Sequence, residues 1–186
     1  MKKTVVINLF AGAGAGKSTL ATSIFSELKM RGVHVELVRE YIKRWVWEGR
    51  LPGKFDQIYI FGRQAREEGM LYEKLDYLIT DSPLLLVPFF EEVLVGKKIV
   101  EPAVFNFIDH AKQNGVEYIN FWLSRPNNYE VRGRYQTEEE AKALDEKLKD
   151  WLKNHGIDLI ELPNKHDDRV AEVLKNLKLH DSPKFD

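Results

Sequence analysis

The chain has 186 residues, with 28 Lys and Arg against 29 Asp and Glu, so its formal net charge is −1. This balance excludes the overall basic character of proteins that live on nucleic acid or anionic lipid, although it leaves room for a local basic patch. The absence of cysteine excludes disulfides and thiolate zinc sites, and the five histidines show no metal-ligand spacing. The length and the apolar content of 44% predict one globular domain.

Strand-like and helix-like segments alternate along the chain. Short apolar or β-branched runs predict strands at residues 4–10, 33–38, 77–80, 117–123 and 157–162. Helical spacing and stop signals predict helices at residues 16–30, 40–47, 55–75, 100–114, 137–156 and 167–177. Thr137 and Glu140 form a capping box at the start of the fifth helix. This alternation predicts an α/β fold with a doubly wound parallel sheet and helices on both faces.

A single domain accounts for nearly all of these segments. We expect one domain over residues 1–178, followed by a flexible tail at 179–186. The basic and apolar N-terminus resembles a short signal peptide, but cleavage there would remove the first strand and cut the glycine-rich loop. No segment approaches the ~18 apolar residues that span a membrane, so we expect a cytoplasmic protein.

The segment AGAGAGKST, residues 11–19, lies between the first strand and the first helix. Gly16 and Lys17 match the phosphate-loop pattern G-x-x-x-x-G-K-[ST], whereas Ala11 stands where the strict pattern has its first glycine. The dinucleotide pattern G-x-G-x-x-G fails because Lys17 occupies its third glycine position. A flexible linker has no reason to carry Lys-Ser-Thr. The flanking strand and helix therefore favour a phosphate loop over a chance match in a turn.

The chemistry of such a loop assigns roles to its residues. Backbone N–H groups from Ala13 to Thr19 are expected to surround the β-phosphate of ATP, and Lys17 is expected to bridge the β- and γ-oxygens. The Ser18 hydroxyl is expected to hold Mg²⁺. The predicted nucleotide-binding residues are Gly12, Ala13, Gly14, Ala15, Gly16, Lys17, Ser18 and Thr19.

A carboxylate follows the third predicted strand, in the segment YLITDSP. Asp81 stands where a second magnesium ligand is expected, at the carboxyl end of a strand. The alternative is an aspartate that caps a turn before Pro83. Ser82 follows Asp81, where ATPases of the AAA type usually have a glutamate that activates water, so simple hydrolysis loses support.

Glu40, just past the second strand, is the candidate base or acceptor contact. A carboxylate at this place contacts the acceptor hydroxyl in many nucleoside kinases. The alternative is an exposed glutamate at a helix start, which the helix dipole favours.

Three arginines follow the fourth strand: Arg125, Arg132 and Arg134. They predict a lid over residues 124–136 that closes on phosphates and stabilises charge in the transition state. A solvated basic loop is the alternative. The predicted catalytic residues are Lys17, Glu40, Asp81, Arg125, Arg132 and Arg134.

The acceptor is expected to bind between the second and third strands, where aromatic and basic residues alternate. One aromatic ring would stack on a base, a glutamine would bond to the base edge, and the basic residues would meet a phosphate. The predicted residues are Tyr41, Arg44, Gln57, Arg63 and Gln64. The alternative assigns the tryptophans of this region to packing.

Four segments together resemble those of small P-loop kinases related to ribosylnicotinamide kinase: AGAGAGKST, REY, ITDSP and the arginine loop followed by QTEEEA. They are closer still to phage-encoded proteins labelled AAA-family ATPases, which would place the chain in a host cytoplasm. The resemblance covers about residues 4–177. It implies a three-layer fold with a five-stranded parallel sheet in the order 2-3-1-4-5, ATP with Mg²⁺, and phosphoryl transfer to a hydroxyl. It assigns these functions to Lys17, Ser18 and Asp81, and more loosely to Glu40 and the lid arginines.

Three functions follow from these features. The leading hypothesis is a kinase acting on a hydroxyl of a nucleoside, a nucleotide or a modified base in DNA. The second is a P-loop ATPase or switch that works with a protein or nucleic-acid partner, and the third is a module that only senses ATP. Turnover that requires an acceptor hydroxyl distinguishes the first from the others, and the sequence leaves the oligomeric state open.

Overall fold

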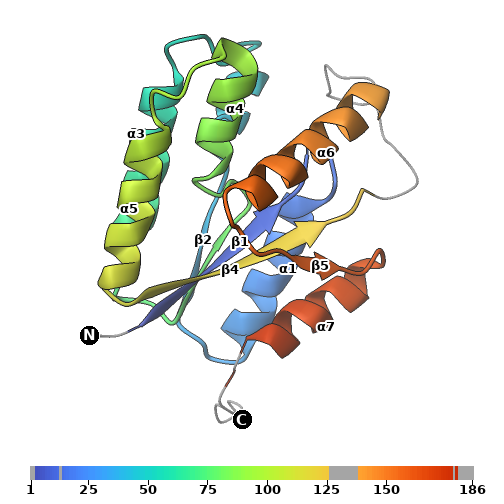
Figure 1. Ribbon diagram of the computed structural model, residues 1–186. Helices are drawn as coiled ribbons and strands as arrows, with labels where there is room; N and C mark the ends of the chain where they lie inside the picture. Colours follow the sequence, from blue (N-terminus) through green and yellow to red (C-terminus); the bar gives the residue numbers. More distant parts are fainter. Residues whose placement is uncertain (1–2, 13, 126–137, 178, 180–186) are drawn as a thin grey trace.

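The computed structural model describes residues 3–12, 14–125, 138–177 and 179. A five-stranded parallel sheet with the order β2-β3-β1-β4-β5 lies at its centre (Figure 1). The strands are β1 (Thr4–Phe10), β2 (Val35–Val38), β3 (Tyr77–Thr80), β4 (Val116–Leu123) and β5 (Ile160–Leu162). The expected fold class and strand order are confirmed.

Helices cover both faces of the sheet and make three layers. The helices are α1 (Lys17–Met30), α2 (Lys43–Trp47), α3 (Gln57–Gly69), α4 (Leu86–Val95), α5 (Glu101–Gln113), α6 (Glu138–Asn154) and α7 (His166–Asn176). Helices α1 and α7 pack on one face, and α3 to α6 pack on the other (Figure 1). This arrangement follows from the alternation of strands and helices, because each parallel crossover places a helix on a face of the sheet.

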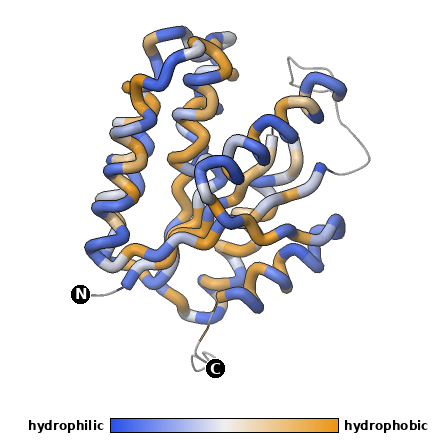
Figure 2. The backbone as a smooth tube through the Cα atoms, in the orientation of Figure 1, coloured by the Kyte–Doolittle hydropathy of each residue, from blue (hydrophilic) through white to orange (hydrophobic). Residues whose placement is uncertain are grey.

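Strand β1 is the central strand and holds the two layers of core together. Ile7 pairs in register with Ile79 of β3 and Ile119 of β4, and it packs in the core beneath α1 and α7. Phe10 points to the opposite face and packs with Trp122 beneath α3 to α6. Figure 2 shows the resulting apolar centre, with hydrophilic residues on the outer faces of the helices. Both faces of the sheet are buried, so its strands read as nearly continuous apolar runs.

The structure differs from the predicted elements at several places. Helix α4 was not predicted, because its apolar sequence shows no single buried stripe; Pro88 fits in its first turn, where no helical N–H bond is lost. Helix α3 ends at Gly69, and the chain turns through Glu73, whose φ is 64°, before it enters β3. Strands β2 and β5 are also shorter than predicted. The capping-box residue Thr137, most of the predicted lid, and the tail except Leu179 lie outside the described residues.

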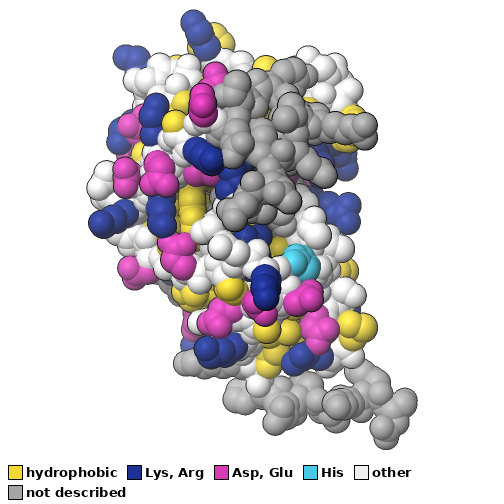
Figure 3. All heavy atoms as spheres, turned by 90° about the vertical axis from the view of Figure 1, so that its right-hand side faces the viewer, with side chains coloured by type: hydrophobic (Ala, Val, Ile, Leu, Met, Phe, Trp, Pro, Cys, Tyr) yellow, Lys and Arg dark blue, Asp and Glu magenta, His cyan; other side chains and the backbone are white. Residues whose placement is uncertain are grey.

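The outer surfaces of the helices are charged. Figure 3 shows basic and acidic side chains intermixed on the face formed by the right-hand side of Figure 1, in agreement with the net charge of −1. Among the described residues, no helix is both long enough and apolar enough to cross a membrane.

The topology fixes where a ligand site can form. Val38, the last residue of β2, pairs with Thr80, the last residue of β3, and β3 lies beside β1. The loops after β1, β2 and β3 therefore leave the same edge of the sheet, which is where open α/β sheets bind ligands.

Candidate active site

The glycine-rich loop runs from the end of β1 into the first turn of α1. Gly14 and Gly16 have φ values of 83° and 93°, a left-handed conformation that a residue with a side chain rarely adopts. Ala11 is buried in the core beneath α1, so a small apolar residue suits this first position. The backbone thus turns sharply and presents the N-terminus of α1, where free N–H groups and the helix dipole favour phosphate. Of the predicted loop residues, only Ala13 lies outside the described part of the chain.

Lys17 lies at the start of α1, with its side chain folded over the loop. Its Nζ atom donates to the carbonyl oxygens of Ala11 at 2.8 Å and Gly12 at 3.0 Å. Burial lowers the pKa of the Lys17 amine, whereas the nearby carboxylates of Glu40 and Asp81 act in the opposite direction. The loop therefore holds a positive charge where the phosphates of a nucleotide would lie.

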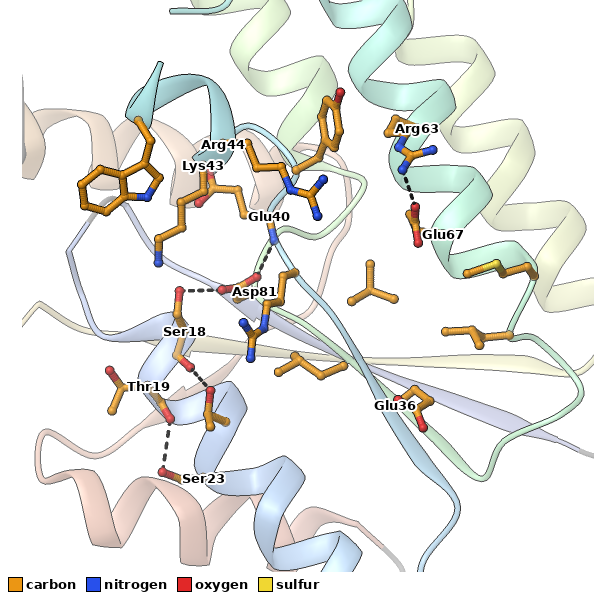
Figure 4. Close-up of a pocket in the computed structure, with 18 residues that line it drawn as sticks. Ser18, Thr19, Ser23, Glu36, Glu40, Lys43, Arg44, Arg63, Glu67 and Asp81 are labelled. Atoms are coloured by element: carbon orange, nitrogen blue, oxygen red, sulfur yellow. Dashed lines mark hydrogen bonds and ion pairs between the residues drawn. The ribbon is translucent and has the colours of Figure 1, made fainter. Parts of the chain in front are cut away.

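Ser18 and Asp81 form the second part of the site. The Ser18 hydroxyl donates to Asp81 Oδ2 at 2.5 Å, and the backbone N–H of Glu40 donates to Asp81 Oδ1 at 2.9 Å (Figure 4). Hydroxyl and carboxylate oxygens are ligands that Mg²⁺ prefers, and Mg²⁺ usually takes its other ligands from water and substrate phosphates. The donor set therefore fits Mg²⁺, although the described residues hold no cluster of three or more metal-binding side chains.

Glu40 lies beside this pair, two residues past the end of β2. The residue is half-buried. Burial raises the pKa of Glu40, the positive charge of Lys17 lowers it, and the negative charge of Asp81 raises it again. The structure thus brings together four residues that the sequence placed on three separate segments: Lys17, Ser18, Glu40 and Asp81.

A cavity of about 1020 Å³ opens between this cluster, the edge strand β2 and helices α1 to α3 (Figure 4). Three of the predicted acceptor residues line it: Tyr41, Arg44 and Arg63. The other two do not. Gln57 and Gln64 are buried, at 3% and 2% exposure, outside the cavity lining. The side-chain amide of Gln64 donates to Glu68 and Thr80 in the core. It is therefore not available to bond to the edge of a base, contrary to the prediction from the sequence.

Gln64 belongs to a buried polar chain behind the site. Tyr72 and Gln64 both donate to the carboxyl group of Glu68, and Gln64 also donates to the Thr80 hydroxyl at 3.3 Å. The Thr80 hydroxyl in turn accepts the backbone N–H of Ser82 at 3.1 Å. Burial raises the pKa of Glu68 to about 7. This chain therefore fixes the segment on both sides of Asp81.

Arg125 is the one predicted lid arginine among the described residues. It does not extend into solvent: its guanidinium pairs with Asp145 of α6, and both side chains are nearly buried, at 7% and 13% exposure. The pair lies against the phosphate loop near Gly12. Arg132 and Arg134 lie outside the described residues.

Two residues of the site were missed in the sequence. Asp145 stands in a charged helical segment typical of a solvated face. Arg169 of α7 is only 4% exposed and donates to the carbonyl oxygens of Ala15 (3.2 Å), Ser124 (2.7 Å) and Pro163 (2.7 Å). It joins the phosphate loop to the ends of β4 and β5. Neither residue carries a local motif, because each acts on a segment far away in the chain.

The fold is similar to that of solved kinases. Deoxyadenosine kinase from M. mycoides, solved with dCMP and dCDP, has a TM-score of 0.58 and 17% identity, over 94% of this chain and 98% of that one. Thymidylate kinase from Ehrlichia chaffeensis has a TM-score of 0.59 and 13% identity, over 95% and 99%. The Mycobacterium tuberculosis APS kinase CysC, in complex with AMPPNP and APS, has a TM-score of 0.56 and 11% identity, over 96% and 100%. At these identities the likeness shows the fold alone.

Sequence comparison places the chain in a family. No curated protein matches it significantly. A family model described as an AAA domain matches residues 6–169, which include the phosphate loop, Glu40, Asp81, Arg125 and Arg169. The match spans most of the chain, which therefore belongs to this AAA-domain family of P-loop proteins.

Proposed function

We propose that the protein is an ATP- and Mg²⁺-dependent kinase that transfers the γ-phosphoryl group to a hydroxyl of a nucleoside, a nucleotide or a modified base in DNA. The observation that carries this proposal is the position of Glu40. Its backbone N–H donates a hydrogen bond to Asp81, and its carboxyl group interacts electrostatically with Lys17. Glu40 also lines a cavity of about 1020 Å³. A carboxyl group between a phosphate loop and a substrate-sized cavity is well placed to orient a bound acceptor hydroxyl and to take its proton during phosphoryl transfer.

Each residue of the site has its own role in the proposed phosphoryl transfer. Lys17 and the N–H groups of the loop would hold the phosphates of ATP, and Ser18 and Asp81 would hold Mg²⁺, which neutralises charge on the phosphates when bound. The acceptor oxygen forms a bond to the γ-phosphorus while the bond from that phosphorus to the bridging oxygen of ADP breaks. ADP leaves with the electron pair, and the acceptor proton passes to Glu40.

Burial prepares Glu40 for this step. The pKa of its carboxyl group is raised by burial, which makes it a stronger base than an exposed glutamate. A general base in this position contributes roughly 10²–10⁴ in rate. Arg125 lies beside the phosphate loop. We also propose that the lid, residues 124–136, closes over the substrates and that Arg132 and Arg134 stabilise charge in the transition state.

The experiment is transfer of labelled phosphate from ATP, measured together with free phosphate. The acceptors are nucleosides, nucleoside monophosphates, nicotinamide riboside and hydroxymethylated DNA; nicotinamide riboside is included because of the resemblance to ribosylnicotinamide kinase. We expect slow hydrolysis alone and transfer when the right hydroxyl is present. Fast phosphate release without any acceptor would favour the ATPase or switch instead.

Glu40→Gln is the matched variant, and Glu36→Gln is its control. Both glutamates line the cavity, but Glu36 is bonded to Lys29 at 3.0 Å on the surface. Glu40→Gln is expected to reduce transfer by roughly 10²–10⁴ with ATP binding nearly unchanged, and Glu36→Gln to change neither. Equal transfer by the two variants would remove Glu40 from the reaction.

A further inference from the structure

Three basic side chains line the cavity without an ion pair or side-chain hydrogen bond to a described residue. Arg39, Lys43 and Arg44 all line it and are exposed. Within the described part of the chain, none of the three forms an ion pair or a side-chain hydrogen bond. Figure 4 shows the amine of Lys43 extending toward Ser18, and the guanidinium of Arg44 lying between Glu40 and Arg63. The cavity thus has one cationic group, that of Lys43, toward the phosphate-loop end and another, that of Arg44, away from it.

Three of the acidic side chains of the same cavity are already engaged. Glu36 pairs with Lys29 at 3.0 Å, and Glu67 pairs with Arg63 at 3.0 Å. Asp81 accepts two hydrogen bonds within the site described above. Glu40 also lines the cavity, and its charge interacts with that of Lys43, so it offsets Lys43 in part. Arg39 and Arg44 have no such described carboxylate, and they favour an anionic occupant.

Two aromatic side chains also line the cavity. Trp47 lines it with 85% of its surface exposed. Tyr41 also lines it, and its position is fixed by a hydrogen bond of 2.9 Å between its hydroxyl and that of Tyr59 and by edge contacts with Trp45. The Trp45 ring is buried, so it packs, whereas the Trp47 ring offers an open face on which a planar base can stack.

We infer that the acceptor is a nucleotide, with a base against Trp47, its own phosphate held by Arg44, and its reacting hydroxyl beside Glu40. This inference rests on the proposed kinase function. Guanidinium groups match phosphate oxygens in two-point contacts, and an anion there balances a guanidinium that forms no ion pair with a described residue. Lys43 faces the other way and would meet the transferred phosphoryl group.

The size of the cavity agrees with this assignment. Small-molecule sites commonly measure about 300–1,000 Å³, and this cavity lies at the top of that range. The same phosphate chemistry is offered by a free nucleoside monophosphate and by a nucleotide within a DNA strand. The experiment distinguishes the two sources.

The test compares acceptors with and without a phosphate. Each nucleoside, its 5′-monophosphate and a single-stranded oligodeoxynucleotide are titrated into protein saturated with a non-hydrolysable ATP analogue and Mg²⁺, and the same acceptors are assayed for transfer. Wild-type protein is expected to bind a phosphorylated acceptor roughly 10- to 100-fold more tightly than the matching nucleoside, the size of one charged hydrogen-bonded contact. Arg44→Gln is expected to remove this preference, and Arg44→Lys to restore part of it. Arg66→Gln changes an exposed cation outside the cavity lining and is expected to leave the preference intact.

Each outcome decides a separate question. Equal binding of nucleoside and monophosphate, or an Arg44→Gln variant that keeps the preference, overturns the inference. Efficient transfer to neutral nucleosides also overturns it while the kinase function stands.

An Arg44-dependent preference without transfer to any acceptor supports the phosphate contact and refutes the kinase. A diphosphate product would show that the phosphate itself is attacked, and would overturn the placement of that phosphate on Arg44. Preference for the oligodeoxynucleotide over every monophosphate would identify the strand as the source.

Discussion

Asp145 of α6 pairs with Arg125 directly beside Gly12 of the phosphate loop. Asp145 Oδ2 lies 2.8 Å from Arg125 Nη2, and a β-carbon on Gly12 would overlap Asp145 Oδ1 and lie 2.8 Å from Arg125 Nη2. The charges of both residues reach Lys17, where Asp145 raises the pKa of the amine and Arg125 lowers it. Helix α6 is therefore packed onto the phosphate loop. Gly12, which is out of register with the strict loop pattern, is required by this close approach.

Gly12→Ala is expected to destabilise the protein by roughly 1–3 kcal/mol, because the new methyl group overlaps Asp145 in a packed interior. It is also expected to weaken ATP binding, since either the Arg125–Asp145 pair beside the loop or the loop itself must shift. Urea unfolding and nucleotide titration measure the two effects. Gly62→Ala is the control: Gly62 lies within α3 with open space around its missing side chain, so alanine there is expected to be neutral or stabilising. Identical unfolding midpoints for the two variants would contradict the packing argument.

Glu68 predicts a pH dependence of stability. Burial raises the pKa of its carboxyl group from 4.5 to about 7 in the folded protein. Below pH 4.5 the Glu68 carboxyl is protonated in both the folded and the unfolded protein, and its contribution to the free energy of unfolding is fully present. This contribution is lost as the pH rises through about 7, because ionising the buried carboxyl is unfavourable in the folded protein. The loss amounts to about 3 kcal/mol at high pH.

Glu68→Gln tests this dependence. Glutamine stays neutral, so the free energy of unfolding of the variant is expected to fall less than that of wild type between pH 5 and pH 8. Replacing an exposed glutamate on α6, in Glu146→Gln, is expected to keep the wild-type slope. Urea unfolding at several pH values supplies the comparison, and parallel curves for Glu68→Gln and wild type would refute the assignment.

How far the sequence predicts the site depends on the distance between the partners. The loop around Lys17 was predictable because strand, glycines and helix are consecutive in the chain. The meeting of Glu40 and Asp81 was also predictable, since both follow parallel strands that end at one edge of the sheet. Gln64 was misplaced because helical spacing alone does not say which face is buried.

The remaining contacts depend on tertiary packing that no local pattern encodes. Asp145 and Arg169 reach the phosphate loop from helices late in the chain, and their neighbours in the sequence are charged residues typical of a surface. Helix α4 has buried residues on most of its circumference, so it lacks the periodic stripe by which a helix is identified.

Lys17→Ala is expected to lower turnover by at least roughly 10²–10³, since one preorganised cation near the transferred charge is lost. Folding is expected to remain intact, because the only described groups that bond to the amine are carbonyl groups of its own loop. Turnover and the circular dichroism spectrum report on the two expectations. Lys29→Ala, at the other end of α1, serves as the control and is expected to retain full turnover. Normal turnover in Lys17→Ala would remove the phosphate-loop assignment.

Arg169→Lys keeps the positive charge of Arg169 but removes the planar guanidinium with its several N–H donors. The guanidinium donates to carbonyl groups from three segments, the phosphate loop at Ala15, the end of β4 at Ser124 and the end of β5 at Pro163, and a single amine has neither the reach nor the directions for all three. Each charged hydrogen bond contributes about 1.5–3 kcal/mol, so the variant is expected to unfold at lower urea concentration than wild type. Because the loop loses a support and no catalytic group is removed, the KM for ATP is expected to rise more than kcat falls. Arg31→Lys, which changes an exposed arginine paired with Glu27, controls for the substitution itself. A variant with unchanged stability and KM but a low kcat would instead place Arg169 in direct contact with the reacting phosphates.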